Sequence, residues 1–234
     1  MDIELYREKR QKFQDEQPVF RDLCLTCLQP SFGCYCQQIR KFDPLVKFVI
    51  LIHPIEARRR IATGRMSHLC LENSELIRGQ DFSEDIKVNQ ILSQPKNHCV
   101  ILYPGKHSFD LGSIGKETER NIFPVDKKLV IFVIDGTWAT AKKTLYQSRN
   151  LQTLNRICFS PSRPSNFRVR KQPAVGCYST VEAIHQTLDM IGMHIGFPTE
   201  LRKHDALISV FDYMVEKQLS FMHRSERRFL RRKV

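Results

Sequence analysis

Apolar runs of strand length recur along the chain and alternate with stretches of helical composition. The runs span residues 45–53, 99–103, 129–135 and 156–160. All six residues from Leu129 to Ile134 are apolar and several are β-branched, which is typical of a strand buried on both faces. Because predicted helices lie between or after these strands, the pattern predicts an α/β fold with a mostly parallel sheet that helices cover on both sides.

Helices are predicted at residues 66–78, 139–148, 180–193 and 207–219. The last of these has apolar residues at helical spacing along one face. The chain has no internal repeat and no low-complexity linker. Its composition changes near residues 42–44, so we expect an N-terminal segment of residues 1–42 and a main domain of residues 43–234 that ends in a basic tail.

The strand at residues 129–135 ends abruptly in Asp135-Gly136-Thr137-Trp138, and a helical stretch follows at once. Thr137 is well placed to cap that helix. A strand, a tight turn and a helix start bring the Asp135 carboxylate to the carboxyl edge of the sheet, where open α/β folds bind ligands. The alternative is that Asp135 only caps the helix and Trp138 only packs.

The other predicted strands also end in polar or turn-forming residues, which favours a small-molecule site at one edge of the sheet. These ends are His53-Pro54, Tyr103-Pro104-Gly105 and Ser160-Pro161-Ser162. The chain has neither a glycine-rich dinucleotide fingerprint nor a phosphate-binding P-loop with its lysine. Ordinary NAD enzymes and NTPases are therefore disfavoured.

Half of the eight cysteines are crowded together, at Cys24, Cys27, Cys34 and Cys36. The first residues are charged throughout and no apolar run is long enough to cross a membrane, so we expect a cytoplasmic, reducing location. Clustered thiols in that setting favour a metal over disulfides, and four thiolates suit a closed, structural Zn²⁺ site. An iron–sulfur cluster or free thiols are the alternatives. The other cysteines lie in apolar contexts and are expected to be small buried hydrophobes: Cys70, Cys99, Cys158 and Cys177.

The chain is strongly basic, with 37 Lys and Arg against 25 Asp and Glu and a formal net charge of +12. This surplus suits a polyanionic partner, with nucleic acid first and an anionic membrane surface second. The alternative is an ordinary enzyme that is basic. Basic residues gather in residues 56–65, 166–171 and 224–233. The first two clusters adjoin predicted strand-end loops, whereas the third is either a binding surface or a solvated helix end.

Several short motifs, in this order, resemble the DTW-domain family of tRNA-uridine aminocarboxypropyltransferases, which are similar to the SPOUT class of RNA-modifying enzymes. The motifs are the four-cysteine cluster with Pro30, His53-Pro54-x-Glu56, Thr63-Gly64-Arg65, Tyr103-Pro104-Gly105, Asp135-Gly136-Thr137-Trp138 and Ser179-Thr180-Val181-Glu182-Ala183. The likeness covers most of the chain. One departure is Ala62, where many members carry asparagine; if that asparagine touches ligand or RNA, this chain does without it.

The resemblance implies transfer of the 3-amino-3-carboxypropyl group of S-adenosylmethionine to N3 of a uridine in tRNA, with methylthioadenosine as by-product. It also implies a SPOUT-like sheet with a C-terminal trefoil-type knot whose loops hold the cofactor. Mapped onto this chain, the cofactor-binding residues are Leu102, Tyr103, Pro104, Gly105, Gly136, Thr137, Trp138, Cys177, Ser179, Thr180 and Glu182. The oligomeric state, monomer or homodimer, is left open.

The proton on uracil N3 is only weakly acidic, so attack on carbon needs a base or a strong hydrogen-bond acceptor. We expect Asp135 to be this base, with partial burial raising its pKa toward the working range. Its rival roles are to bind the α-amino group of the methionine moiety or to orient the turn. Ser179, Thr180 and Glu182 are expected to hold the amino-acid end of the donor, unless they only form a helix cap.

The basic clusters supply the expected contacts to RNA phosphates, because the arginine fork suits phosphate. The candidates are Arg59, Arg65, Arg168 and Arg170. Two other functions stay open at this point. An RNA methyltransferase with the same cofactor needs the same pocket and RNA surface. A non-enzymatic zinc-containing RNA-binding protein leaves Asp135 and residues 179–182 unexplained.

Overall fold

The computed structural model describes Glu4 and residues 22–59, 61–115, 122–124, 126–170 and 176–231, the last nine of these by backbone alone. The expectations for most of residues 1–21, for Lys171 and for the side chains of the basic tail therefore lie outside the described residues. Among the described helices, none combines the length and the apolar character that a membrane span requires.

The core of the molecule is a six-stranded sheet in which every pair of neighbouring strands is parallel. Its strands are β1 (Lys47–Ile52), β2 (Ser74–Arg78), β3 (Asn97–Leu102), β4 (Phe109–Asp110), β5 (Lys128–Asp135) and β6 (Asn155–Cys158), in the order β2-β1-β5-β3-β6-β4. The predicted mostly parallel sheet is confirmed. Strand β5 lies between β1 and β3, and its six apolar residues follow from this central position.

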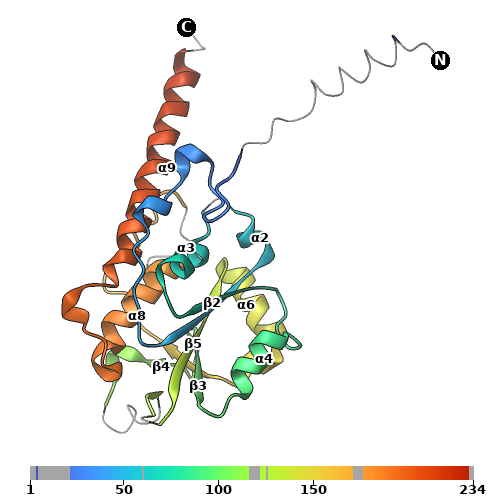
Figure 1. The fold of residues 1–234 in the computed structure, drawn as a ribbon, viewed down its shortest axis with the longest axis vertical. Coiled ribbons are helices and arrows are strands. Elements are labelled where there is room, and N and C mark those ends of the chain that lie inside the picture. Colours follow the sequence, from blue (N-terminus) through green and yellow to red (C-terminus); the bar gives the residue numbers. More distant parts are fainter. Residues whose placement is uncertain are drawn as a thin grey trace.

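Helices cover both faces of the sheet (Figure 1). One face packs against α3 (Thr63–Cys70), α8 (Thr180–Ile195) and α9 (Asp205–Arg231). The other packs against α4 (Ile86–Ser93), α6 (Trp138–Gln147) and α7 (Arg149–Gln152). Alternation along β1 shows why both layers are needed, since Phe48 and Ile50 enter the first layer's core while Val49 and Leu51 enter the second.

The predicted helix at residues 66–78 is confirmed as far as Cys70 and is wrong beyond it. Helix α3 ends at Cys70, the backbone of Leu71 is extended, and β2 follows as an edge strand paired only with β1. Most of the β2 side chains are half-exposed, so the segment lacks the continuous apolar run that marks the inner strands. Helix α4 and the two-residue strand β4 were not predicted, and β6 is shorter than the predicted run at residues 156–160.

The cysteine-rich segment packs onto the main core. It contains two single 3₁₀ turns, η1 (Ser31–Gly33) and η2 (Cys36–Gln38). Tyr35 and Phe42 are buried in the same cluster as the α8 and α9 side chains, and the Phe32 ring meets Phe221 of α9 edge to face at 5.0 Å. The boundary at residues 42–44 stays a sequence prediction, although this packing ties the two parts together.

A polar network joins α8 to the start of α9 after the short turn η4 (Thr199–Leu201). Asp189 accepts hydrogen bonds from Arg202 at 2.6 Å and pairs with the buried His204 at 2.7 Å. Asp205 similarly pairs with Arg202 at 2.6 Å and with the buried His185 at 2.7 Å. Two carboxylates, one guanidinium and two imidazoles thus share this junction. Because Arg202 already supplies the cation that the acids need, the cluster is best explained as an ion-pair network that fixes α9 on α8.

Candidate functional site

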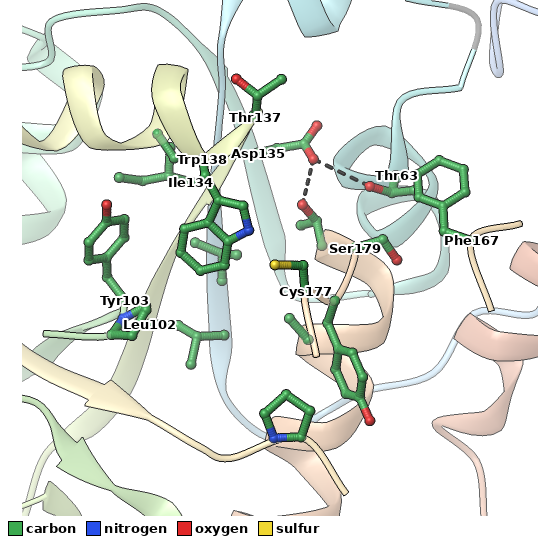
Figure 2. Close-up of a pocket in the computed structure, with 18 of the residues that line it drawn as sticks. Thr63, Leu102, Tyr103, Ile134, Asp135, Thr137, Trp138, Phe167, Cys177 and Ser179 are labelled. Carbon is green, nitrogen blue, oxygen red and sulfur yellow. Dashed lines mark hydrogen bonds between the residues drawn. The ribbon is translucent and has the colours of Figure 1, made fainter. Parts of the chain in front are cut away.

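A cavity of about 930 Å³ opens at the carboxyl ends of β3 and β5 (Figure 2). Its wall combines strand ends, the turn before α6, the loop after β6 and the start of α8. Its lining includes Arg59, Thr63, Leu102, Tyr103, Pro104, Asp135, Gly136, Thr137, Trp138, Arg170, Cys177, Ser179 and Thr180. A volume of this size is in the range of small-molecule sites.

Most of the residues predicted from the sequence meet at this cavity. Asp135 and nine of the eleven predicted cofactor-binding residues line it, whereas Gly105 and Glu182 do not. Of the four predicted RNA-binding arginines, Arg59 and Arg170 line it and Arg65 and Arg168 do not. Thr63 was not predicted as a site residue; its hydroxyl donates a hydrogen bond to Asp135, which lies 72 residues away in the sequence.

Asp135 is the last residue of β5 and its side chain is almost completely buried. Its Oδ1 atom accepts hydrogen bonds from the Thr180 hydroxyl at 2.5 Å and from the Thr63 hydroxyl at 3.4 Å. Its Oδ2 atom is buried and makes no hydrogen bond of ordinary geometry among the described residues, although the Gly64 backbone N–H is close enough to the carboxylate to lower its pKa. Burial raises the pKa of Asp135, and the Thr180 hydrogen bond offsets part of this rise.

Gly64 is required by the position of this carboxylate. A Cβ at residue 64 would lie 2.7 Å from both Cγ and Oδ2 of Asp135. Next to it, the buried Arg65 donates a hydrogen bond from Nη2 to the Ala57 carbonyl oxygen. Each residue of the Thr-Gly-Arg motif therefore has a local role. Thr63 donates a hydroxyl hydrogen bond to Asp135, Gly64 leaves space for that carboxylate, and Arg65 binds the Ala57 carbonyl oxygen.

Ala62 occupies the N-cap position of α3 and makes no side-chain cap. Asparagine is among the favoured residues at that position, because its side-chain oxygen accepts from an unpaired helix N–H. An asparagine at this position would therefore cap α3, a contribution of about 1 kcal/mol that Ala62 does not make.

Thr137 caps α6 as predicted, since its hydroxyl oxygen accepts from the Thr140 backbone N–H at 3.1 Å. Asp135 takes no part in that cap, so the alternative that it serves only as the helix cap is not supported. Trp138 is 43% exposed and meets the Tyr103 ring edge to face at 6.2 Å. Its indole therefore forms a wall of the cavity rather than core packing (Figure 2).

Glu182 forms the capping box of α8 with Ser179. Its Oε2 atom accepts from the Ser179 backbone N–H at 2.9 Å and from the Ser165 hydroxyl at 2.7 Å, and its Oε1 atom accepts from the Asn166 N–H at 2.8 Å. Both oxygens are thus used inside the protein. For Glu182, the alternative that it only caps the helix is therefore the better explanation. Ser179 and Thr180, at the start of α8, do line the cavity.

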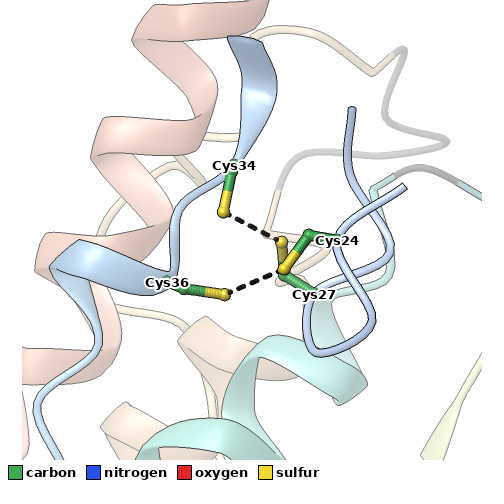
Figure 3. Close-up of side chains that lie close together, drawn as sticks. All are labelled: Cys24, Cys27, Cys34 and Cys36. Atoms are coloured by element: carbon green, nitrogen blue, oxygen red, sulfur yellow. Dashed lines mark hydrogen bonds between the residues drawn. The ribbon is translucent and has the colours of Figure 1, made fainter. Parts of the chain in front are cut away.

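The four N-terminal cysteines point toward one centre (Figure 3). The sulfur atoms of Cys24 and Cys36 are 3.6 Å apart, as are those of Cys27 and Cys34, and all four lie within 4.8 Å of one another. A tetrahedral zinc with Zn–S bonds of about 2.3 Å separates its sulfurs by about 3.8 Å. Backbone N–H groups of Cys27 and Thr26 lower the pKa of Cys24 to about 6, whereas burial raises the pKa of Cys27 and of Cys36, so the charge of a bound cation is needed to hold all four sulfurs as thiolates. The donor set therefore fits zinc.

We predict that Gly64→Ala is destabilised by about 1–3 kcal/mol, because its Cβ forces the Asp135 carboxylate or α3 to move. A fall of several degrees in the thermal midpoint is the expected measurement. Gly115→Ala is the matched control, since a Cβ there meets nothing within 4 Å. Equal midpoints for the two variants would contradict the proposed crowding.

We predict that the stability of Asp135→Asn, relative to the wild type, rises as the pH increases from about 4, the ordinary carboxyl pKa, through the raised pKa of Asp135 in the folded protein. The raised pKa means that the folded wild type binds the Asp135 proton more tightly than the unfolded chain does. The cost of a buried charge is therefore absent at low pH and complete above the folded pKa. Thermal midpoints across this range test the sign, and a constant difference would contradict it.

Comparison with known proteins places the chain in a family. The DTW domain family model matches residues 21–219. A Drosophila melanogaster protein named tRNA-uridine aminocarboxypropyltransferase 2 is 29% identical, covering 75% of this chain and 69% of the relative. A Mus musculus protein of that name is 26% identical, and the match spans 57% of its length. The Arabidopsis thaliana tRNA-uridine aminocarboxypropyltransferase A is 24% identical, covering 94% of this chain and 90% of the relative.

No solved structure shows significant similarity. The chain belongs to the DTW domain family.

Proposed function

We propose that this protein is a tRNA-uridine aminocarboxypropyltransferase, which transfers the 3-amino-3-carboxypropyl group of S-adenosylmethionine to N3 of a uridine in tRNA. Membership of the DTW domain family and the names of the relatives support this activity. The observation that carries the chemistry is Asp135, a buried carboxylate among the residues that line the cavity. A buried carboxylate with a raised pKa is a stronger base than an exposed one, so Asp135 is suited to accept a weakly acidic proton.

The residues present fit the proposed donor. The apolar and aromatic wall at Tyr103 and Trp138 suits an adenine ring. The start of α8, with Ser179 and Thr180, suits a carboxylate, because a helix N-terminus favours negative charge. When bound, S-adenosylmethionine supplies an activated carbon and a neutral thioether leaving group.

The protein's contribution is a base and a fixed geometry. Asp135 takes the proton from uracil N3 as the N3–carbon bond forms and the carbon–sulfur bond breaks, which leaves methylthioadenosine. Thr180 and Thr63 hold Oδ1, and Oδ2 lies buried beside Gly64. The proposed step therefore requires uracil N3 to approach this carboxylate from the cavity that Asp135 lines. The walls of the cavity position the donor's side-chain carbon, rather than its methyl group, toward the nucleophile.

The RNA surface is proposed at the mouth of this cavity. Arg59 and Arg170 line it and are the best placed of the predicted arginines to reach a phosphate. Arg168 is instead paired with Glu216 of α9, and Arg65 is buried in its contact with Ala57. Whether the basic tail adds to this surface lies outside the described side chains.

We also propose that the four-cysteine cluster holds one structural Zn²⁺. The sulfur spacing and the thiolate-favouring turn support it, and all four tetrahedral positions would be filled by protein. The metal would order the turns that pack Phe32 and Tyr35 against the main core. Reduced thiols fit a cytoplasmic location.

A SPOUT-like class with a trefoil-type knot remains part of the proposal. Its support is the parallel sheet and the way that segments after β3, after β5 and before α8 meet at one cavity. A catalytic domain at residues 43–234 and a monomer or homodimer are likewise proposals from the sequence.

We predict that Asp135→Asn lowers single-turnover transfer by about 10²- to 10⁴-fold, because the amide cannot accept the N3 proton. In the wild type, the raised pKa predicts a rate that falls as pH falls through the folded pKa of Asp135. Mass spectrometry of tRNA, with isotope labels on the methyl and carboxypropyl carbons of the donor, measures both outcomes. Transfer of the labelled methyl would instead identify a methyltransferase, and undiminished transfer would remove Asp135 from the mechanism.

We predict about one equivalent of zinc in protein purified without chelator, as a closed four-ligand site requires. Cys27→Ser should lower both the zinc content and the thermal midpoint, because Cys27 is a buried member of the cluster. Cys99→Ser is the matched control, since Cys99 lies outside the cluster. Metal-free protein of undiminished stability would contradict the site.

A further inference from the structure

Glu56 is a buried acidic residue that has no role in the proposed transfer reaction. It lies on the short helix α2 (Pro54–Ala57), is only 4% exposed, and does not line the cavity. Its Oε1 atom has no hydrogen-bond partner among the described residues, but Arg59 Nη1 lies 3.3 Å away at ion-pair distance. The backbone is held by His53, whose Nδ1 accepts from the Ile55 N–H.

Stability alone does not explain this ion pair. The Arg59 side chain is 46% exposed, so solvent screens its attraction to Glu56 and the pair contributes little to stability. Burying a carboxylate with so little compensation is unfavourable. Burial accordingly raises the pKa of Glu56, while Arg59 and Arg170 act in the opposite direction. Because burying the Glu56 carboxylate costs stability, its presence near the cavity suggests that it serves the site.

Four charged groups gather on this side of the cavity. Asp135, Arg59 and Arg170 line it, and Glu56, which does not line it, is paired with Arg59 and is near enough to Arg170 and Asp135 for their charges to affect its pKa. The guanidinium of Arg170 also lies over the Phe167 ring, 5.9 Å from its centroid. Each arginine has five N–H donors in a rigid fork, more than one ion pair uses. Donors therefore remain for an anionic ligand.

We propose that Glu56 is a positioning residue that holds Arg59 against the cavity, so that Arg59 and Arg170 form a clamp for a substrate oxyanion. The clamp rests on the proposed function, in which two oxyanions approach this cavity. One is the carboxylate of the donor and the other is a phosphate beside the target uridine. The guanidinium fork binds either group in the same way.

Equilibrium binding of three probes tests the clamp: S-adenosylmethionine, methylthioadenosine, which lacks the carboxylate, and tRNA. If the donor carboxylate is the ligand, Glu56→Gln and Arg59→Gln each weaken S-adenosylmethionine about tenfold and leave methylthioadenosine unchanged. If a phosphate is the ligand, both variants weaken tRNA and reduce its salt dependence instead. The double variant should be no weaker than Arg59→Gln, because Glu56 acts through Arg59.

Glu75→Gln is the matched control. It removes the same charge from an ion pair, Glu75 with Lys47 at 3.2 Å, toward the amino ends of the strands and away from the cavity. It should bind all three probes as the wild type does. The thermal midpoint of Glu56→Gln should not fall below that of the wild type, because the substitution removes a buried charge; a merely structural Glu56 predicts a clear fall.

Several outcomes would overturn the clamp: unchanged affinities in Glu56→Gln, independent additive effects in the double variant, or an Arg59→Gln protein that binds every probe normally. The last measurement does not depend on Glu56→Gln folding, since the Arg59 side chain is half-exposed. None of these assays needs turnover. Absence of transfer would therefore refute the proposed function alone, and unchanged binding would refute the clamp alone.

Discussion

The buried carboxylate of Asp135 is the constraint around which the strand-end loops are arranged. It ends the central strand β5, and its Oδ1 atom receives hydroxyl donors from Thr63 of α3 and Thr180 of α8. Its own backbone oxygen accepts from the His53 N–H at the end of β1. Residue 64 is glycine because a Cβ would collide with the carboxylate. Since a buried carboxylate without donors is costly, both helices must start at this point of the sheet edge.

Buried acidic side chains in this protein differ in how many of their carboxylate oxygens have hydrogen-bond partners, and this difference distinguishes an acid that stabilises the fold from those near the cavity. Glu182 is buried and has partners on both oxygens, so it serves the fold by joining the loop at Ser165 to α8. Asp135 and Glu56 are equally buried, yet each keeps an oxygen without a hydrogen-bond partner among the described residues. Buried polar groups are normally satisfied, and exceptions gather where a ligand completes the arrangement. Asp135 lines the cavity and Glu56 pairs with Arg59, which also lines it, whereas the corresponding atoms of His98 and Thr144 lie on residues outside the cavity lining.

The inner strands could be predicted from the sequence because burial on both faces requires a run of apolar residues within each strand. Strands β1, β3 and β5 are covered on both faces and have nearly continuous apolar runs. Helices α6, α8 and α9 were predicted for a similar reason, since each has a local cap or an apolar stripe. The edge strand β2 was mistaken for helix because its half-exposed residues have no such run, and its pairing with β1 is a distant contact.

By itself, the sequence determined the parallel α/β class, the strand–turn–helix at Asp135 with Thr137 as its cap, and the crowding of four cysteines. Only the tertiary structure decided which motifs meet. Thr63 and Thr180 are 72 and 45 residues from Asp135, and Arg65 proved to be an internal tether. The physical reason is that burial, caps and turns depend on neighbouring residues. Contacts between loops depend on the order β1-β5-β3, which the crossover connections establish.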